Sequence, residues 1–171
     1  MNANDAHIWQ ALGMGPQWQL KTATTAVCSP NDGLLMAGNF ELSDTPEGPR
    51  PNGQTGVLLL NMLAAISMSL EHITFLSLKQ TLAEAPDLKE RLKTNPFSQV
   101  VLVGDEAVQA LFGPQSSARS HHGVPHGVAL PGCSAEVVVL PALTDLIAQP
   151  ALKAKAWESL CLIRARFLLP H

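Results

Sequence analysis

Three histidines stand close together at His121, His122 and His126, and they form the cluster that most resembles a metal site. Imidazole nitrogens bind zinc well, but a zinc site usually has four ligands. No cysteine or carboxylate lies within six residues of these histidines in the sequence. We therefore interpret them as part of a polar loop and predict no metal.

The turn after residues 100–103 resembles a phosphate-binding turn, because Gly104 separates an apolar run from a helical segment. Backbone amides at the start of a helix bind anions. However, the turn lacks the G-x-G-x-x-G pattern, and the carboxylates of Asp105 and Glu106 would repel a phosphate. We predict no nucleotide cofactor at this turn.

The three cysteines give no cofactor site either. Cys28, Cys133 and Cys161 are far apart and show no metal-ligand spacing, which favours reduced thiols in a cytoplasm. An iron–sulfur cluster is held by four thiolates, and the chain contains only three cysteines. No cofactor is expected.

The composition is that of a globular protein that is poor in charge. Of its 171 residues, 46% are apolar and 15% are charged, so few charged side chains remain to cover the surface. This balance favours apolar area that meets a partner. The net charge of −3 is opposite in sign to that of proteins that hold DNA by its phosphates, so any DNA contact is expected to be weak or indirect.

The start of the chain, MNANDAHIWQ, lacks the basic end and long apolar run of a signal peptide. The longest apolar runs are too short to span a bilayer. A soluble, cytoplasmic protein without membrane contact is expected.

Short apolar runs alternate with helical segments from residue 34 onward. Strands are predicted over residues 34–38, 73–78, 100–103 and 136–140. Helices are predicted over residues 56–68, residues 86–94, a segment capped by Asp105 and closed by Gly113, and a segment from Pro150 onward. Residues 43–55 and 114–132 are rich in proline and glycine and are predicted to be loops. Because uninterrupted apolar strands are covered on both faces, the pattern predicts a doubly wound, mostly parallel four-stranded α/β sheet flanked by helices.

The helix predicted over residues 56–68 has more apolar side chains than one face can bury. Its sheet-facing set is Leu59, Met62, Leu63 and Ile66. Val57, Leu60 and Ala64 then point elsewhere, and either a neighbouring loop or a partner protein covers them.

The last helix carries a second apolar face. We expect it to bury Leu152, Ala156, Leu160, Ile163 and Phe167. Trp157 stands beside this set and is expected to be a further core anchor.

The N-terminal residues 1–25 have a composition unlike that of the following domain, residues 26–171. Two of the three tryptophans of the chain, Trp9 and Trp18, fall in this short segment, which Gly13, Gly15 and Pro16 interrupt. Tryptophan is a favoured anchor of peptides that dock on another protein. The segment is either such a peptide, linked through threonine-rich residues 21–25, or the first helix of the core.

Several blocks of the sequence resemble known families. Residues 58–66 (LLLNMLAAI), 100–113 (VVLVGDEAVQALFG) and 137–162 follow each other as in the iron–sulfur uracil-DNA glycosylases. Residues 9–20 (WQALGMGPQWQL) and 141–157 (PALTDLIAQPALKAKAW) are similar to the psi subunits of the bacterial DNA polymerase III clamp loader. That family has a glycosylase-like fold without the activity, and these blocks are spread along the chain from residue 9 to residue 162.

The resemblance implies a uracil-DNA-glycosylase-like fold and a non-catalytic adaptor in DNA replication. Its body would bind the chi subunit, which links the loader to single-stranded DNA-binding protein. We assign Val57, Leu60 and Ala64 to the chi contact. Its N-terminal peptide would bind the collar of the gamma or tau ATPase subunits through Trp9, Leu12, Trp18 and Leu20. The mechanism would be tethering, which raises effective concentration without new chemistry.

The glycosylase motifs themselves are altered. The family's G-E-x-P-G loop reads Gly38-Asn39-Phe40-Glu41-Leu42, which keeps a polar residue but loses the proline and the second glycine. Its His-Pro pair, whose imidazole stabilises the departing base, is replaced by Pro141-Ala142-Leu143. An active uracil-type DNA glycosylase in base-excision repair is the alternative, and a glycosylase-like module with other partners is a third hypothesis.

Overall fold

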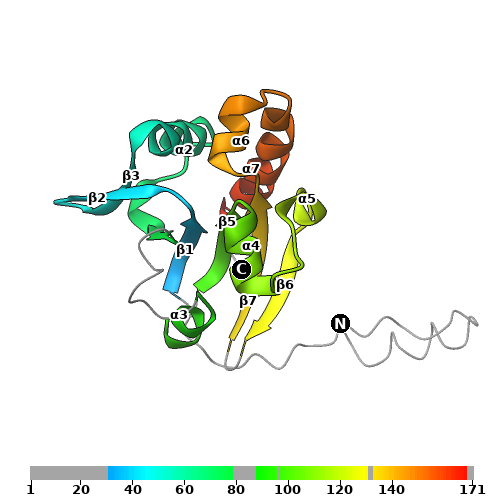
Figure 1. Cartoon of the computed structure of the whole chain (residues 1–171). Helices are drawn as coiled ribbons and strands as arrows, with labels where there is room; N and C mark the ends of the chain where they lie inside the picture. The colour runs from blue at the N-terminus through cyan, green and yellow to red at the C-terminus, as the bar shows by residue number, and fades with distance from the viewer. Residues whose placement is uncertain (1–30, 79–87, 96, 131–132, 169–171) are drawn as a thin grey trace, which may run out of the picture.

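A five-stranded, mostly parallel sheet forms the centre of the protein (Figure 1). The computed structural model describes residues 31–78, 88–95, 97–130 and 133–168. The strand order is β4-β1-β5-β7-β6, and β6 runs antiparallel to β7 while the other neighbours are parallel. In this order the strands are β4 (Ile73–Ser77), β1 (Asn31–Gly38), β5 (Phe97–Val103), β7 (Cys133–Leu140) and β6 (His126–Leu130).

The predicted mostly parallel α/β sheet is confirmed, but the predicted number of four strands is wrong. The additional strand, β6, lies within the segment that we predicted to be a loop, residues 114–132. As an edge strand, β6 pairs with β7 alone, and residues Gly127 and Ala129 are exposed. An edge strand of this kind needs no apolar run, so the sequence gives little sign of it.

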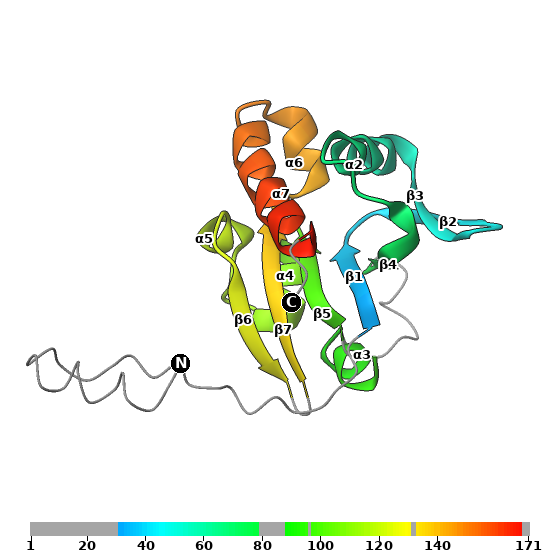
Figure 2. The same ribbon diagram turned by 180° about the vertical axis from the view of Figure 1, so that it is seen from behind.

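Helices cover both faces of the sheet. One face carries α2 (Gly53–Ala65), α6 (Leu143–Ala148) and α7 (Leu152–Leu168), as Figure 2 shows from behind. The other face carries α3 (Leu88–Thr94), α4 (Asp105–Phe112) and α5 (Ala118–His121). Successive side chains along a strand pack alternately into the two cores. On β5, Val101 and Val103 pack on the first face, and Val100 and Leu102 pack on the second. The sheet is therefore covered by helices on both faces, which is compatible with the predicted doubly wound fold.

The segment 43–55, which we predicted to be a loop, is a β-hairpin followed by the start of α2. Strands β2 (Glu41–Thr45) and β3 (Gly48–Asn52) pair antiparallel in a separate two-stranded sheet. Pro49 and Pro51 are typical of loops, but β3 pairs only with β2, and an edge strand tolerates residues that lack an N–H donor.

The C-terminal part also differs from the prediction. A short helix, α6, precedes α7, and the residues around Pro150 separate the two. On α7 the side chains of Ala156, Leu160 and Ile163 are buried, as predicted, but Trp157 is 48% exposed. The prediction of Trp157 as a core anchor is wrong, because the inner face of α7 is already filled by these smaller residues.

Helix α4 begins differently from the prediction as well. Its N-cap is Gly104, at φ +85°, and no side chain caps the first turn. The carboxylate of Asp105 accepts hydrogen bonds from the Ala118 N–H (2.6 Å) and the Ser117 hydroxyl (3.2 Å) instead. Asp105 thus holds the start of α5 against α4.

No helix in the described part of the chain is long and apolar enough to cross a membrane.

Candidate partner-binding surface

Helix α2 presents an uncharged outer face. None of its 13 residues is ionisable, although the helix lies at the surface. Leu59 and Leu63 are buried against the sheet, whereas Val57 is 56% exposed and Ala64 is also exposed. Leu60 is half-buried and packs partly against the core. We call Val57, Leu60 and Ala64 the α2 patch.

The position of α2 is fixed by close packing. A Cβ added at Gly56 would lie 2.5 Å from the backbone carbon of Pro51, so the helix approaches β3 more closely than any other residue would allow. The Asn52 side chain caps the first turn by accepting from the Gly53 N–H at 2.7 Å. The α2 patch is therefore displayed on a rigid element. The cores of protein interfaces are depleted in charged residues, as this patch is.

The carboxyl ends of β1 and β5 form the topological switch point, where α/β proteins of this type bind ligands. The chain leaves β1 toward α2 on one face and leaves β5 toward α4 on the other. Here Gly38 lies so close to β5 that an added Cβ would meet the Val103 Cβ at 2.7 Å and a Phe40 ring carbon at 2.9 Å. The switch point is tightly packed.

Phe40 fills the space at the switch point, next to the carboxyl end of β1. Its side chain is fully buried and meets the Phe75 ring edge-on, with the ring centres 6.3 Å apart. The buried Ser77 hydroxyl donates to the Phe40 carbonyl at 2.5 Å, which fixes the backbone after β1. An aromatic ring thus occupies the space beside the end of β1.

The polar groups near these strand ends are few. Asn39 Oδ1 is buried and has no hydrogen-bond partner among the described residues. Glu41 is exposed on β2, at the hairpin end next to α2. At the end of β7, Pro141 is buried and Ala142 packs against Gly104, where an added Cβ would lie 3.3 Å from the Ala142 Cβ. The structure brings Asn39 near the switch point and leaves Glu41 at the solvent side.

We predicted that the three histidines lie in a polar loop, and this prediction is wrong. His121 ends α5 and His126 begins β6, and their ring nitrogens Nδ1 and Nε2 lie 3.2 Å apart. The His121 ring stacks on Phe112 of α4 at a centre distance of 4.9 Å. Within the residues that the structure describes, no group of three or more histidine, cysteine, aspartate or glutamate side chains is placed to hold a metal ion. The histidines pack the end of α4 against β6.

His122 makes the stability of the fold depend on pH. Burial is the main cause that lowers the pKa of His122 below 6.5, and the positive charge of Lys155 lowers it further. The folded protein then keeps His122 neutral at a pH at which the unfolded chain binds a proton. Since the unfolded state binds more protons, the free energy of unfolding falls as the pH drops below 6.5 and levels off below the folded-state pKa.

We predict that His122→Gln weakens this pH dependence. Thermal melts of the wild type and the variant at several pH values between about 5 and 8 measure it. The wild type should lose more of its melting temperature on acidification than His122→Gln does. Equal losses in the two proteins would contradict this assignment.

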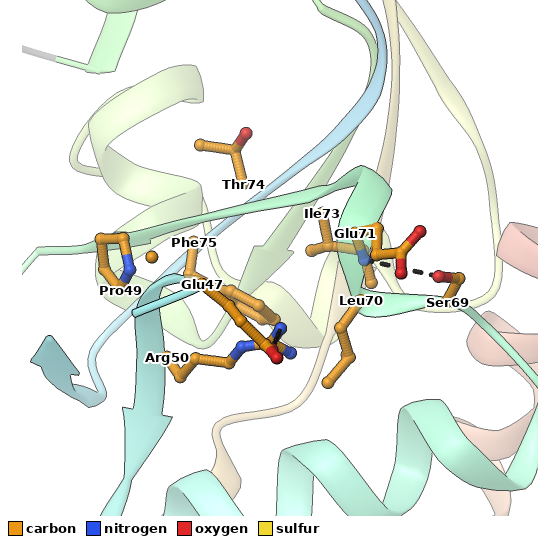
Figure 3. A pocket seen from close by; sticks show the side chains of 10 residues that line it. Glu47, Pro49, Arg50, Ser69, Leu70, Glu71, Ile73, Thr74 and Phe75 are labelled. Atoms are coloured by element: carbon orange, nitrogen blue, oxygen red, sulfur yellow. Dashed lines mark hydrogen bonds and ion pairs between the residues drawn. The ribbon is translucent and has the colours of Figure 1, made fainter. Parts of the chain in front are cut away.

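A groove of about 730 Å³ lies between the β2–β3 hairpin and the edge strand β4 (Figure 3). Its ionisable side chains are Glu47, Glu71 and Arg50, and Arg50 forms an ion pair with Glu47 at 2.6 Å. Glu47 and Arg50 neutralise each other, so the groove provides a space but no pair of side chains placed for acid–base chemistry. The groove could not be predicted from the sequence, because the hairpin that forms one of its walls was predicted to be a loop. The lining residues are Glu47, Gly48, Pro49, Arg50, Ser69, Leu70, Glu71, Ile73, Thr74 and Phe75.

The remaining predicted site residues lie outside the described part of the chain. These are the residues assigned to the ATPase contact: Trp9, Leu12, Trp18 and Leu20. In comparisons with known proteins, neither a family model nor a curated protein matches this chain.

Proposed function

We propose that this protein is a non-catalytic adaptor of the psi type in the DNA polymerase III clamp loader. The observation that carries the proposal is the uncharged, exposed α2 patch on a rigidly held helix. The α2 patch binds the chi subunit, and a peptide within residues 1–25 binds the collar of the gamma or tau ATPase. Sequence blocks at both ends of the chain resemble the psi family and support this choice of partners.

The adaptor acts by tethering. Chi bound to the α2 patch carries single-stranded DNA-binding protein, and the N-terminal peptide holds the ATPase. Joining two contacts in one chain makes the second binding step intramolecular and raises the effective concentration of each partner. With a net charge of −3, the chain itself contributes little attraction for DNA phosphates.

The packing at the switch point supports an adaptor without glycosylase activity. A glycosylase needs a pocket that receives a flipped base. Here Phe40 is fully buried beside the end of β1, and Pro141-Ala142-Leu143 follows β7 in place of a His-Pro pair. A buried Phe40 at one of these strand ends, and no histidine directly after β7, support an adaptor over a glycosylase.

Incubation of the protein with uracil-containing single- and double-stranded DNA should produce no abasic sites above the buffer level. The assay is alkaline cleavage of end-labelled DNA, with an active uracil-DNA glycosylase as the positive control. Asn39→Ala is the decisive variant, since Asn39 Oδ1 is a buried polar atom without a partner among the described residues. Turnover that disappears in Asn39→Ala would establish the alternative, an active glycosylase.

Mixing the purified full-length protein with chi and with the ATPase subunit separates the adaptor from a glycosylase-like module with other partners. Size-exclusion chromatography should give a one-to-one complex with chi and a ternary complex when the ATPase is added. If neither complex forms, the assignment to the clamp loader is wrong.

A further inference from the structure

Helix α7 is apolar on two opposite faces. Its inner face packs on the sheet through Leu152, Ala156, Leu160 and Ile163. Its outer face carries a second line of exposed apolar or small side chains: Ala154, Trp157, Cys161 and Ala165. Spacings of three and four residues place these four on one side of a helix. We call them the outer stripe.

The outer stripe is open along its length. Figure 2 shows α7 in front of the sheet, with no other described helix or strand between α7 and the viewer. Trp157 is 48% exposed, and the Cys161 thiol is free and exposed. At 1.5 Å per residue the stripe is about 16 Å long, which matches roughly three helical turns. A half-exposed tryptophan between small side chains fits a partner that receives the indole in an apolar pocket.

Basic side chains border the outer stripe on the side of Trp157. Lys153 and Arg164 lie on this border, whereas Glu158 lies on the opposite border and Lys155 lies further round the helix. All three basic side chains are exposed, and none forms an ion pair within the described residues. Glu158 is the single acidic residue of α7, whereas the whole chain is acidic, with a net charge of −3. Positive charge is thus concentrated along one border of the stripe, at Lys153 and Arg164.

We infer that the outer stripe of α7 is a docking site for an amphipathic helix that carries acidic residues along one edge of its apolar stripe. The small residues Ala154, Cys161 and Ala165 let a second helix approach closely, and the basic border formed by Lys153 and Arg164 attracts its carboxylates. This docking site lies on a different helix from the α2 patch and goes beyond the proposed function.

Two other occupants fit the same surface less well. In an antiparallel pair of α7 helices, the basic border of one copy would meet the basic border of the other, which repels a second copy of this chain. Single-stranded nucleic acid matches the charge, but a binding groove for it normally has several aromatic side chains for stacking, and the stripe has one, Trp157.

Two synthetic helical peptides test the inference. Both have about 18 residues, enough for a stable helix, and share one stripe of leucine and alanine. Glutamate lines one edge of the stripe in one peptide and lysine lines it in the other. Fluorescence anisotropy of the labelled peptides is measured with the full-length protein at low and near-physiological salt. The acidic peptide should bind and the basic peptide should not, and salt should weaken the binding.

Variants locate the binding on α7. Trp157→Ala should weaken the acidic peptide about tenfold or more. The double variant Lys153→Glu/Arg164→Glu should reverse the preference in favour of the basic peptide. Arg91→Glu/Lys93→Glu on α3, on the opposite face of the sheet, makes the same change in net charge and should leave binding unchanged. Thermal melts establish that each variant is folded.

Several outcomes would overturn the inference. One is that the acidic peptide fails to bind or binds no better than the basic one. Another is that Trp157→Ala binds as the wild type does. The third is that a single-stranded thymidine oligonucleotide binds more tightly than the acidic peptide, or that Trp157→Ala abolishes self-association seen by sedimentation. Either result would assign the stripe to nucleic acid or to a second copy.

Discussion

Replacing Val57 with glutamate should leave the protein folded and remove most of its affinity for chi. Val57 is 56% exposed on α2, so a carboxylate at this position stays hydrated in the free protein. In the proposed complex the same carboxylate is buried against chi without a partner. An uncompensated buried charge costs about 3–5 kcal/mol, which corresponds to a loss of roughly 100-fold or more in affinity.

Isothermal titration of chi into each variant measures this effect, and Val124→Glu provides the matched control. Val124 is also a valine, is 54% exposed, and lies in the segment between α5 and β6 rather than on α2. It should bind chi as the wild type does. If Val57→Glu keeps full affinity for chi, the α2 patch is not the chi contact. If both variants lose affinity, the effect of charge is not specific to α2.

The three residues of the α2 patch differ in how strongly they indicate an interface. Leu60 lies on the patch side of α2 but is half-buried, so its side chain contributes to the core as well as to the patch. Packing against the core accounts for an apolar residue at this position even without a partner. The exposed Val57 and Ala64 lack that explanation, which makes them the sharper markers of an interface.

The central strands were predictable because burial on both faces leaves a direct trace in the sequence. Runs such as Val100–Val103 and Val137–Leu140 are apolar throughout, and the structure places both in the middle of the sheet. The edge elements leave no such trace. Strand β6 and the β2–β3 hairpin are only partly buried, and Pro49 and Pro51 resemble loop residues when the pairing partner is unknown.

Two single residues show the same limit. The sequence shows that Phe40 follows the first strand, but its burial depends on Phe75, which lies on β4 and is far away in the chain. Trp157 adjoins the apolar face of α7 in sequence, yet one residue along a helix turns the side chain by about 100°. Ala156 takes the inner position, and Trp157 is left on the outer stripe. To predict whether a large aromatic residue on a helix is buried, one must know which way its side chain points around the helix axis. Hydrophobicity alone does not give that direction.

Replacing Trp18 with alanine should remove most of the affinity for the clamp-loader ATPase while leaving chi binding intact. Trp18 and Trp9 stand in a segment interrupted by Gly13, Gly15 and Pro16, and residues 9–20 are similar to the N-terminal peptide of the psi subunits. We expect Trp18 to insert into a pocket at the ATPase collar, with Trp9 and Leu12 as supporting contacts. Loss of a central aromatic anchor costs about 2–4 kcal/mol, or roughly 30- to 1000-fold in affinity.

Binding titrations with the ATPase and with chi, together with thermal melts, compare the wild type, Trp18→Ala and a deletion of residues 1–20. Gln17→Ala is the matched control, since it changes the neighbouring residue without removing the anchor. Trp18→Ala and the deletion should bind chi as the wild type does and melt at nearly the same temperature, because an anchor for a partner contributes little to the free protein. A fall of many degrees in the melting temperature of Trp18→Ala would mean that Trp18 packs in the core. The separation between an N-terminal ATPase peptide and a chi-binding body would then be wrong, even if the variant also lost ATPase binding.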